Sequence, residues 1–426
     1  MSEKKENSIE FEKGKCIKCT KCVMRCNNLG ISHLVVKGEG KEKYIDFNPG
    51  SPCVNCGQCT LVCPVNSMRE QSDIENVKAL LADKNKYVIV QYAPSVRTSI
   101  NEIFKMEHSS NVEKKLNTCL KLLGFRKIFD VNFGADITSI AEADELLERI
   151  EDGGTLPMFT SCCPSWIKFV KSYEPGLTPN LTTALSPHIH GGLAYKTWWA
   201  EKEGIDPKNI VVVSIMPCTS KKDEIHEYNG SRAVDLVLTV RELGRLITEK
   251  GIDFASLEES DGDLLSEYSG GAVIYGKSGG VMESALRVVK KKVDNEPFES
   301  LQTQEITEDG ISFREASVQI GSKPVKIAII SGPKNFRSFI KSGKYKEYHY
   351  IEIMNCPGGC IGGGGQPLLP AKPALETEIL QKRRDLLQSM DKTNKKRSAF
   401  DNLNVQEYLK WVDSKNLRDK LLFKYN

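Results

Sequence analysis

Residues 348–367 read YHYIEIMNCPGGCIGGGGQP, and this stretch decides how the rest of the chain is interpreted. It opens with a short apolar run typical of a strand and continues into Cys356 and Cys360. Four consecutive glycines, at residues 362–365, follow the second cysteine. Because glycine is costly in backbone entropy, this density indicates that another group must approach the backbone very closely. Cysteines directly after a strand suggest that this group is a metal centre.

Similar strand-like runs recur from about residue 73 onward, and amphipathic stretches such as residues 139–154 lie between some of them. Short β-branched runs that alternate with helices are typical of parallel or mixed sheets covered by helices. The sequence therefore predicts an α/β domain. The other runs are residues 86–94, 156–161, 209–217, 234–240, 271–276 and 325–332.

Two regular cysteine runs occupy the N-terminal part, CIKCTKCVMRC at residues 16–26 and CVNCGQCTLVC at residues 53–63. Both have the spacing C-x2-C-x2-C-x3-C, in which three close thiolates bind one 4Fe–4S cubane and the fourth binds the other. A pair of zinc sites is the alternative, but zinc needs only four ligands and rarely spaces them in such runs. One predicted ligand set is Cys16, Cys19, Cys22 and Cys63. The other is Cys53, Cys56, Cys59 and Cys26.

Five of the six remaining cysteines follow predicted strands. Open α/β sheets place ligands beyond the carboxyl ends of their strands, so we expect these five cysteines to meet at one sheet edge. Four thiolates would complete a third cubane, and the fifth would be left for chemistry. Cys119, in LNTCLKLLGF, has the spacing of a buried helical residue and is expected in the core. The five strand-end cysteines are Cys162, Cys163, Cys218, Cys356 and Cys360.

Three segments carry a family resemblance: TSCCPSW (160–166), MPCTSKKDE (216–224) and EIMNCPGGCIGGGGQP (352–367). In this order they resemble the signature segments of the iron-only (FeFe) hydrogenases, although Ser165 stands where glycine is usual. The resemblance implies an H-cluster, a 4Fe–4S cubane joined to a diiron subcluster with CO, CN⁻ and a bridging dithiolate. It implies the cubane ligands Cys163, Cys218, Cys356 and Cys360, with Cys360 also bridging to the diiron unit.

The resemblance also assigns neighbours of the diiron unit. Lys221 matches the lysine that holds a cyanide ligand, an arrangement favoured by a charge-assisted hydrogen bond. The glycines would let the backbone turn tightly around the cofactor. The remaining implied cofactor-binding residues are Pro94, Ser95, Met216, Pro217, Met354 and Gln366.

A proton path is suggested by Glu142, Glu145 and Arg149, which share one helix face at spacings of three and four residues. Taken alone, this pattern is more typical of a solvated charged face. The resemblance implies instead a relay in which Cys162 passes protons between Glu142 and the site, fed from Glu145 and Arg149. Thr182 occupies the position of a relay hydroxyl. Burial of such a relay would raise the pKa of Glu142.

The whole chain has 426 residues, 40% hydrophobic and 27% charged, which is ordinary for a soluble globular protein. Its formal net charge of +3 gives no indication of a nucleic-acid partner. No apolar run approaches the roughly 18 residues that a membrane helix needs. The first residues, MSEKKENSIEFEKGK, lack the apolar core of a secretory signal, so a cytoplasmic location is expected.

The predicted organisation is a small α+β ferredoxin-like domain (1–75), an α/β catalytic domain in two lobes (76–370) and a helical tail (371–426). The resemblance implies reversible reduction of protons to H₂ with ferredoxin as electron carrier, and maturation proteins that install the diiron unit. An acidic ferredoxin would meet the basic residues of the first cysteine run, Lys13, Lys15, Lys18, Lys21 and Arg25.

Two other functions fit parts of this pattern. One is a hydrogenase-like iron–sulfur assembly scaffold, whose members tend to lose the paired cysteines, the lysine and the glycine run that are all present here. The other is an H₂ sensor, which would usually carry an added signalling domain.

Overall fold

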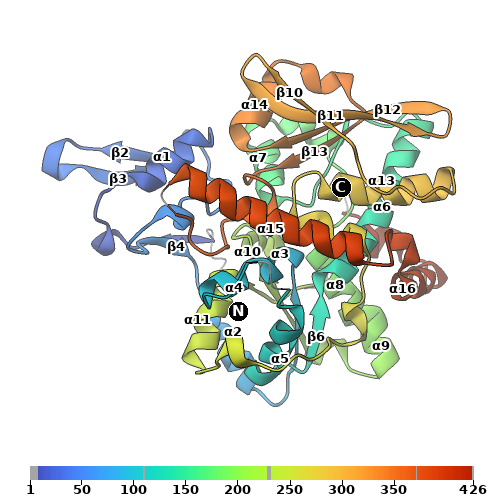
Figure 1. Cartoon of the computed structure of the whole chain (residues 1–426), viewed down its shortest axis with the longest axis horizontal. Coiled ribbons are helices and arrows are strands. Elements are labelled where there is room, and N and C mark those ends of the chain that lie inside the picture. Colours follow the sequence, from blue (N-terminus) through green and yellow to red (C-terminus); the bar gives the residue numbers. More distant parts are fainter. Residues whose placement is uncertain (1–7, 109–110, 228–231, 371, 425–426) are drawn as a thin grey trace.

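A computed structural model describes residues 8–108, 111–227, 232–370 and 372–424. Figure 1 shows the N-terminal part (blue) projecting from one side of two larger lobes, with the long helix α15 (Pro373–Thr393) crossing in front of them. The projecting part contains α1 (Lys21–Asn28) and two small antiparallel sheets. These sheets pair β1 (Ile9–Phe11) with β4 (Met68–Glu70), and β2 (Leu34–Lys37) with β3 (Tyr44–Phe47).

The first lobe is built on a four-stranded parallel sheet in the order β6-β5-β8-β9. Every residue of its strand β8 is buried. This is expected where helices cover both faces of a parallel sheet. The strands are β5 (Tyr87–Tyr92), β6 (Lys127–Asp130), β8 (Ile210–Met216) and β9 (Leu236–Thr239). Helices of this part include α2 (Ile74–Ala82), α5 (Glu113–Leu123), α8 (Pro187–Ala194), α10 (Lys221–Glu227) and α11 (Val240–Glu249).

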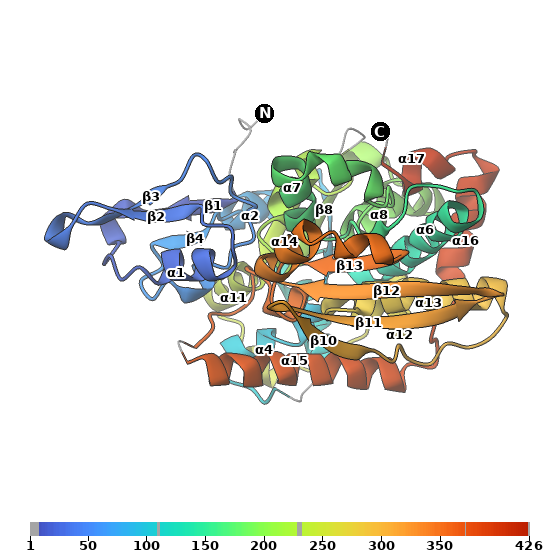
Figure 2. The same cartoon turned by 90° about the horizontal axis from the view of Figure 1, so that it is seen from above.

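The second lobe holds a five-stranded mixed sheet in the order β10-β11-β12-β13-β7, and Figure 2 shows β10, β11, β12 and β13 lying side by side. Strands β12, β13 and β7 are parallel, whereas β10, β11 and β12 form an antiparallel meander. The strands are β7 (Met158–Phe159), β10 (Gln304–Glu308), β11 (Ile311–Ile320), β12 (Lys323–Ser331) and β13 (Tyr350–Met354). Helices α6 (Val131–Glu151), α7 (Pro164–Tyr173), α13 (Gly280–Val293) and α14 (Pro333–Lys341) accompany this sheet.

The predicted fold class is confirmed, with two differences in detail. The run at residues 271–276, predicted as a strand, is helical, because Ser269 caps the short helix α12 (Gly270–Val273) by accepting from the Ala272 backbone N–H. A short apolar run fits a buried helix as well as a strand, so periodicity could not separate the two. Strands β6, β10 and β11 were not predicted from the sequence.

The cysteine loops follow strands of both sheets. Cys162 and Cys163 come after β7, Cys356 comes after β13, and Cys218 comes after β8 of the other lobe. The expectation that these strands share one sheet edge is therefore wrong. Instead, the carboxyl ends of two sheets face each other, and the site lies between the lobes.

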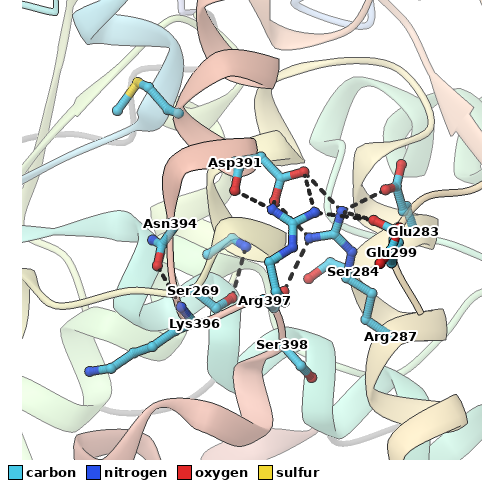
Figure 3. A network of polar contacts seen from close by, with 12 residues as sticks. Ser269, Glu283, Ser284, Arg287, Glu299, Asp391, Asn394, Lys396, Arg397 and Ser398 are labelled. Carbon is cyan, nitrogen blue, oxygen red and sulfur yellow. Dashed lines mark hydrogen bonds and ion pairs between the residues drawn. The ribbon is translucent and has the colours of Figure 1, made fainter. Parts of the chain in front are cut away.

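The C-terminal segment contains α15, α16 (Leu403–Ser414) and α17 (Arg418–Leu422). Figure 3 shows how a polar network fastens it to α13. Asp391 of α15 accepts from Arg287 Nη1 at 2.7 Å and Nη2 at 2.9 Å, and it also pairs with Arg397 at 2.8 Å. Glu283 is a second partner of Arg287, at 2.7 Å. The predicted domain bounds, at residues 75 and 370, stay a prediction.

We expect Asp391→Ala to destabilise the protein. The change leaves the buried guanidinium of Arg287 with one carboxylate instead of two, and breaking a buried ion pair costs about 3 kcal/mol. The urea midpoint of unfolding, followed by circular dichroism, should fall clearly. Asp385→Ala is the control. Exposed Asp385 is bonded to Gln381 on the same helix and to no other described residue, so the change should alter stability by less than about 0.5 kcal/mol. Equal midpoints for the two variants would contradict the anchoring role.

Within the described residues, no helix is both long and apolar enough to cross a membrane.

Candidate metal-cluster and proton-transfer site

A cavity between the two lobes collects the strand-end cysteines. All five of them line it, together with Lys221 and most of the other residues predicted to surround the cofactor. Gln366 does not line the cavity but supports its wall, since its Nε2 donates to the carbonyls of Ser95 (3.1 Å) and Cys360 (3.3 Å). The predicted residues found in the lining are Pro94, Ser95, Cys162, Cys163, Met216, Pro217, Cys218, Lys221, Met354, Cys356 and Cys360.

The thiols of this cavity are enclosed by protein between the lobes, and the resulting desolvation opposes their ionisation. Desolvation raises the pKa of Cys218 to about 12 and raises the pKa values of Cys163, Cys356 and Cys360 above the ordinary thiol value. Metal ions reverse this preference, because a coordinating thiol is held as the thiolate. All five are free cysteines.

The donor set fits a sulfur-ligated iron cluster. Thiolates are the ligands that iron–sulfur clusters take, and these thiols surround a cavity together with a cation and two methionines. Among the described residues, no three His, Cys, Asp or Glu side chains converge closely enough to hold a single metal ion.

Lys221 lies in a buried ion network that sequence reasoning did not foresee. Its Nζ donates to Glu224 Oε2 at 2.7 Å and to the Cys162 carbonyl at 3.1 Å. Burial lowers its pKa, but the charge of Glu224 outweighs this effect and leaves the pKa of Lys221 above its ordinary value. His188 and Ser186 also bond to Glu224. Glu224 lies on the same face of α10 as Lys221, so the i, i+3 spacing was the available signal.

Glu142 is fully buried on α6, so the alternative of a solvated charged face is wrong. Its Oε1 accepts from the Tyr350 hydroxyl at 2.9 Å, and its Oε2 has no partner among the described residues. Desolvation is the main reason that the pKa of Glu142 rises to about 8. Cys162 lies close enough that the charge of Glu142 helps to raise the pKa of its thiol, after burial itself. Nothing in the sequence spacing pointed to Tyr350.

Glu145 connects this buried acid to the protein surface. Its Oε2 accepts from the Thr182 hydroxyl at 2.5 Å and from the Thr183 backbone N–H at 2.8 Å, while Arg149 pairs with its Oε1 at 2.6 Å. Glu145, Arg149 and Thr183 line a surface recess near the C-terminus. Thr183 was missed in the sequence, although it directly follows Thr182.

The N-terminal cysteines lie in two groups that each draw on both cysteine runs. Cys26, Cys53, Cys56 and Cys59 line one cavity, which combines both cysteine runs. Burial is the main reason that the pKa of the Cys22 thiol is raised. The three other members of its set, Cys63, Cys16 and Cys19, lie close enough to raise it further. Cys119 lies in the apolar core, as expected.

The glycine run brings the second cysteine run against the catalytic cavity. A Cβ at Gly364 would lie 2.1 Å from the Cys56 carbonyl oxygen, and one at Gly363 would lie 2.2 Å from the Pro217 carbonyl oxygen. Gly359, at φ +97°, would place a Cβ 2.6 Å from the Ser278 nitrogen. Close approach of neighbouring backbone thus requires these glycines, and the predicted explanation by the cofactor alone was incomplete.

Comparison with known proteins agrees with this geometry. Residues 86–364 match the family described as the iron only hydrogenase large subunit, C-terminal domain, and residues 15–67 match a 4Fe-4S dicluster domain. Iron hydrogenase 1 of Clostridium pasteurianum is 40% identical over 99% of this chain and 76% of its own length. The chain belongs to the iron-only hydrogenase family. The predicted resemblance is therefore confirmed.

Other hydrogenases are similar over most of their length. The periplasmic [Fe] hydrogenase large subunit of Nitratidesulfovibrio vulgaris is 38% identical, over 85% of this chain and 87% of that protein. An apo [FeFe]-hydrogenase HydA1 variant from Chlamydomonas reinhardtii superposes with a TM-score of 0.72 at 32% identity, over 83% of this chain and 98% of that one. The iron-only hydrogenase fold thus accounts for both lobes.

The family also has relatives in iron–sulfur assembly. The cytosolic iron-sulfur assembly component 3 of Pongo abelii is 27% identical over 85% of this chain and 82% of its own length. Family membership therefore establishes an iron–sulfur, metal-binding protein with hydrogenase homology, and the activity itself is decided by the residues of the site.

Proposed function

We propose that this protein is an FeFe hydrogenase that catalyses the reversible reduction of protons to H₂. One observation carries the proposal: five cysteines and the buried cation Lys221 line a single cavity between the lobes. Four of these cysteines would hold the H-cluster cubane, namely Cys163, Cys218, Cys356 and Cys360. That division leaves Cys162 as a thiol for proton transfer.

The H-cluster, when bound, supplies the electron-rich iron centre at which protons and H₂ interconvert. The chain's contribution is to exclude water from the cavity and to hold the cofactor in place. Lys221, fixed by Glu224, would donate to an anionic ligand of the cofactor. Pro94, Ser95, Pro217 and the two methionines, Met216 and Met354, form the surrounding wall.

The proton path would follow Glu145, Thr182, Glu142 and Cys162. Arg149 fixes Glu145 at the surface recess, and Glu145 also accepts from the hydroxyl of the buried Thr182. A carboxyl with a pKa of about 8 is protonated at neutral pH and matched to proton transfer near that pH. Its unpartnered Oε2 is the atom free to carry the proton.

Glu142→Gln tests this path. Glutamine keeps the shape of the side chain, but its amide neither gains nor loses a proton near neutral pH. H₂ evolution should therefore fall by about 10²–10⁴-fold. In the wild type, evolution should decline as the pH rises through about 8 and Glu142 ionises; the variant's residual rate should lack this inflection. An unchanged pH profile would contradict the relay.

The same substitution has a stability signature. Between pH values of about 4.5 and 8 the folded chain keeps a proton on Glu142 that the unfolded chain releases. The free energy of unfolding of the wild type therefore falls as the pH rises through this window. Glu142→Gln removes that contribution, so urea midpoints should favour the variant more at pH 8 than at pH 5.

Electrons would enter through the two N-terminal cubanes. Cys19 of the first run is exposed, and the second run contacts Gly364, which directly follows the cavity-lining Gly363. The first cubane would thus receive electrons at the surface, and the second would pass them inward.

An acidic ferredoxin is the proposed carrier. Lys13, Lys15, Lys18 and Lys21 are exposed around the first run. Arg25 is not part of this basic surface, because it pairs with Glu376 at 2.6 Å and both side chains are only 18% exposed. Its inclusion among the docking residues was wrong.

We expect electron transfer from ferredoxin to slow as salt is added. Steered association is enhanced by about 10–10³-fold at low ionic strength and loses this gain when charges are screened. Lys18→Glu with Lys21→Glu should abolish the salt dependence of stopped-flow reduction rates. A lysine-to-glutamate change at exposed Lys208, before β8, is the matched control. If the reduction rate of the unmodified protein did not depend on salt, the proposed docking surface would be contradicted.

The decisive assay is H₂ evolution from reduced viologen by protein matured and purified without oxygen. Maturation proteins that install the diiron unit must be supplied by the host. Rapid evolution supports the enzyme. Suppose instead that the protein holds all three cubanes but evolves no H₂, while a control hydrogenase from the same host is active. This result would favour the assembly scaffold or an H₂ sensor. A cytoplasmic location stays a prediction, because one relative is a periplasmic hydrogenase.

A further inference from the structure

Asn355 is a buried amide that the proposed mechanism does not use. It lies between the end of β13 and Cys356, is 0% exposed, and lines the catalytic cavity. Neither its amide nitrogen nor its amide oxygen has a partner at full hydrogen-bond geometry among the described residues. A buried polar group left in this state costs about 1–3 kcal/mol. A bound group must therefore satisfy it.

Asn355 faces both sets of thiols. Its backbone N–H is directed at the sulfur of Cys163 in the catalytic cavity. Its side-chain amide lies beside the sulfur of Cys56, which lines the separate cavity of the second N-terminal cubane. One residue thus stands at the junction of two predicted cluster sites.

The surroundings of this junction strengthen any hydrogen bond made there. Gly364 packs against Gly57 and the Cys56 carbonyl, so protein backbone fills the space beside Cys56. The residues on either side of Cys56, Asn55 and Gly57, are also buried. In such a dry environment, a hydrogen bond to a charged sulfur is stronger than in water.

We propose that the Asn355 amide donates a hydrogen bond to the Cys56 thiolate, or to an adjacent sulfide, and thereby raises the reduction potential of the cubane held by Cys26, Cys53, Cys56 and Cys59. Reduction adds negative charge to a cluster, and a donor aimed at its sulfur stabilises the more negative state. Asn355 is then a positioning residue for electrons, holding them on the cubane next to the catalytic cavity. The inference rests on the cluster ligands of the proposed function.

The test is a redox titration followed by electron paramagnetic resonance on the full chain carrying its cubanes. The signal of the second cubane is identified by its loss in Cys53→Ala. Asn355→Ala removes the donor, and Asn355→Leu removes it while keeping similar bulk. In both variants the potential of the second cubane should fall by about 59 mV, the equivalent of a tenfold change in a one-electron equilibrium. The potential of the first cubane should not move.

Two results would overturn the inference. If the reduction potential of the second cubane is unchanged in both variants, the proposed hydrogen bond from Asn355 is contradicted. A shift in Asn355→Ala but not in Asn355→Leu assigns the effect to lost bulk and entry of water. The readout is independent of H₂ evolution. A chain that shows the shift without evolving H₂ supports the role of Asn355 and contradicts the hydrogenase proposal, whereas an active chain without the shift contradicts the role of Asn355 alone.

Discussion

Cys163→Ala should abolish H₂ evolution completely and remove the iron of the catalytic cubane. The structure places this thiol in the cavity between the lobes, where desolvation raises its pKa and only bound metal would hold it as thiolate. With one of four ligands missing, neither the cubane nor the diiron unit attached to it has a stable site. Iron analysis should report the loss of about four iron atoms per chain before any diiron unit is installed.

Cys119→Ala is the matched control for this experiment. It removes a thiol of equal size that is also buried, but from the apolar core and away from any cluster site. Iron content should then stay at the wild-type value, with only a modest loss of stability. A normal iron content in Cys163→Ala, with the control intact, would show that the assignment of ligands in the cavity is wrong.

Cys162→Ala should have the second-largest effect, and of a different kind. The three cubanes should form as in the wild type, while H₂ evolution falls by about 10²–10⁴-fold, the usual contribution of a positioned proton-transfer group. The reason is geometric: Cys162 lines the cavity and lies near Glu142, so it joins the proton path to the site. Cys162→Ser, which restores a hydroxyl, should recover part of the rate.

Two measurements separate this outcome from simple loss of the cofactor. Iron content and the resonance signals of the cubanes must match the wild type in Cys162→Ala. Near-full turnover in that variant would rule out the relay role and would leave the fifth cysteine without an assigned function.

Much of the fold was predictable because its signals are local. The two cysteine runs have a spacing that few other sites use, and β5, β8 and β13 are short runs of mainly apolar residues. The segment at residues 271–276 misled because its apolar residues are buried in a helix. Its N-cap, Ser269, was a signal that the apolar run obscured.

The site was predictable as a set of residues but not as an arrangement. Spacing alone could not show that Cys218 approaches from one sheet and Cys163 and Cys356 from the other. Partners such as Glu224 and Tyr350 are chosen by tertiary packing, and Tyr350 is 208 residues away from Glu142 in the chain. Likewise, only the three-dimensional structure shows that Arg25 is neutralised by Glu376 of the C-terminal helix.

The position of the cavity between two sheets has a consequence for assembly of the protein. A cubane bound to Cys218 of one lobe and to Cys163, Cys356 and Cys360 beside the other would act as an inorganic cross-link between them. Such a link restricts the unfolded chain and couples the affinity for iron to folding. Without iron, these cysteines would remain as unbound thiols, and no metal–sulfur bonds would link the two lobes. Delivery of the cluster is then also the step that locks the two lobes into one cooperative unit.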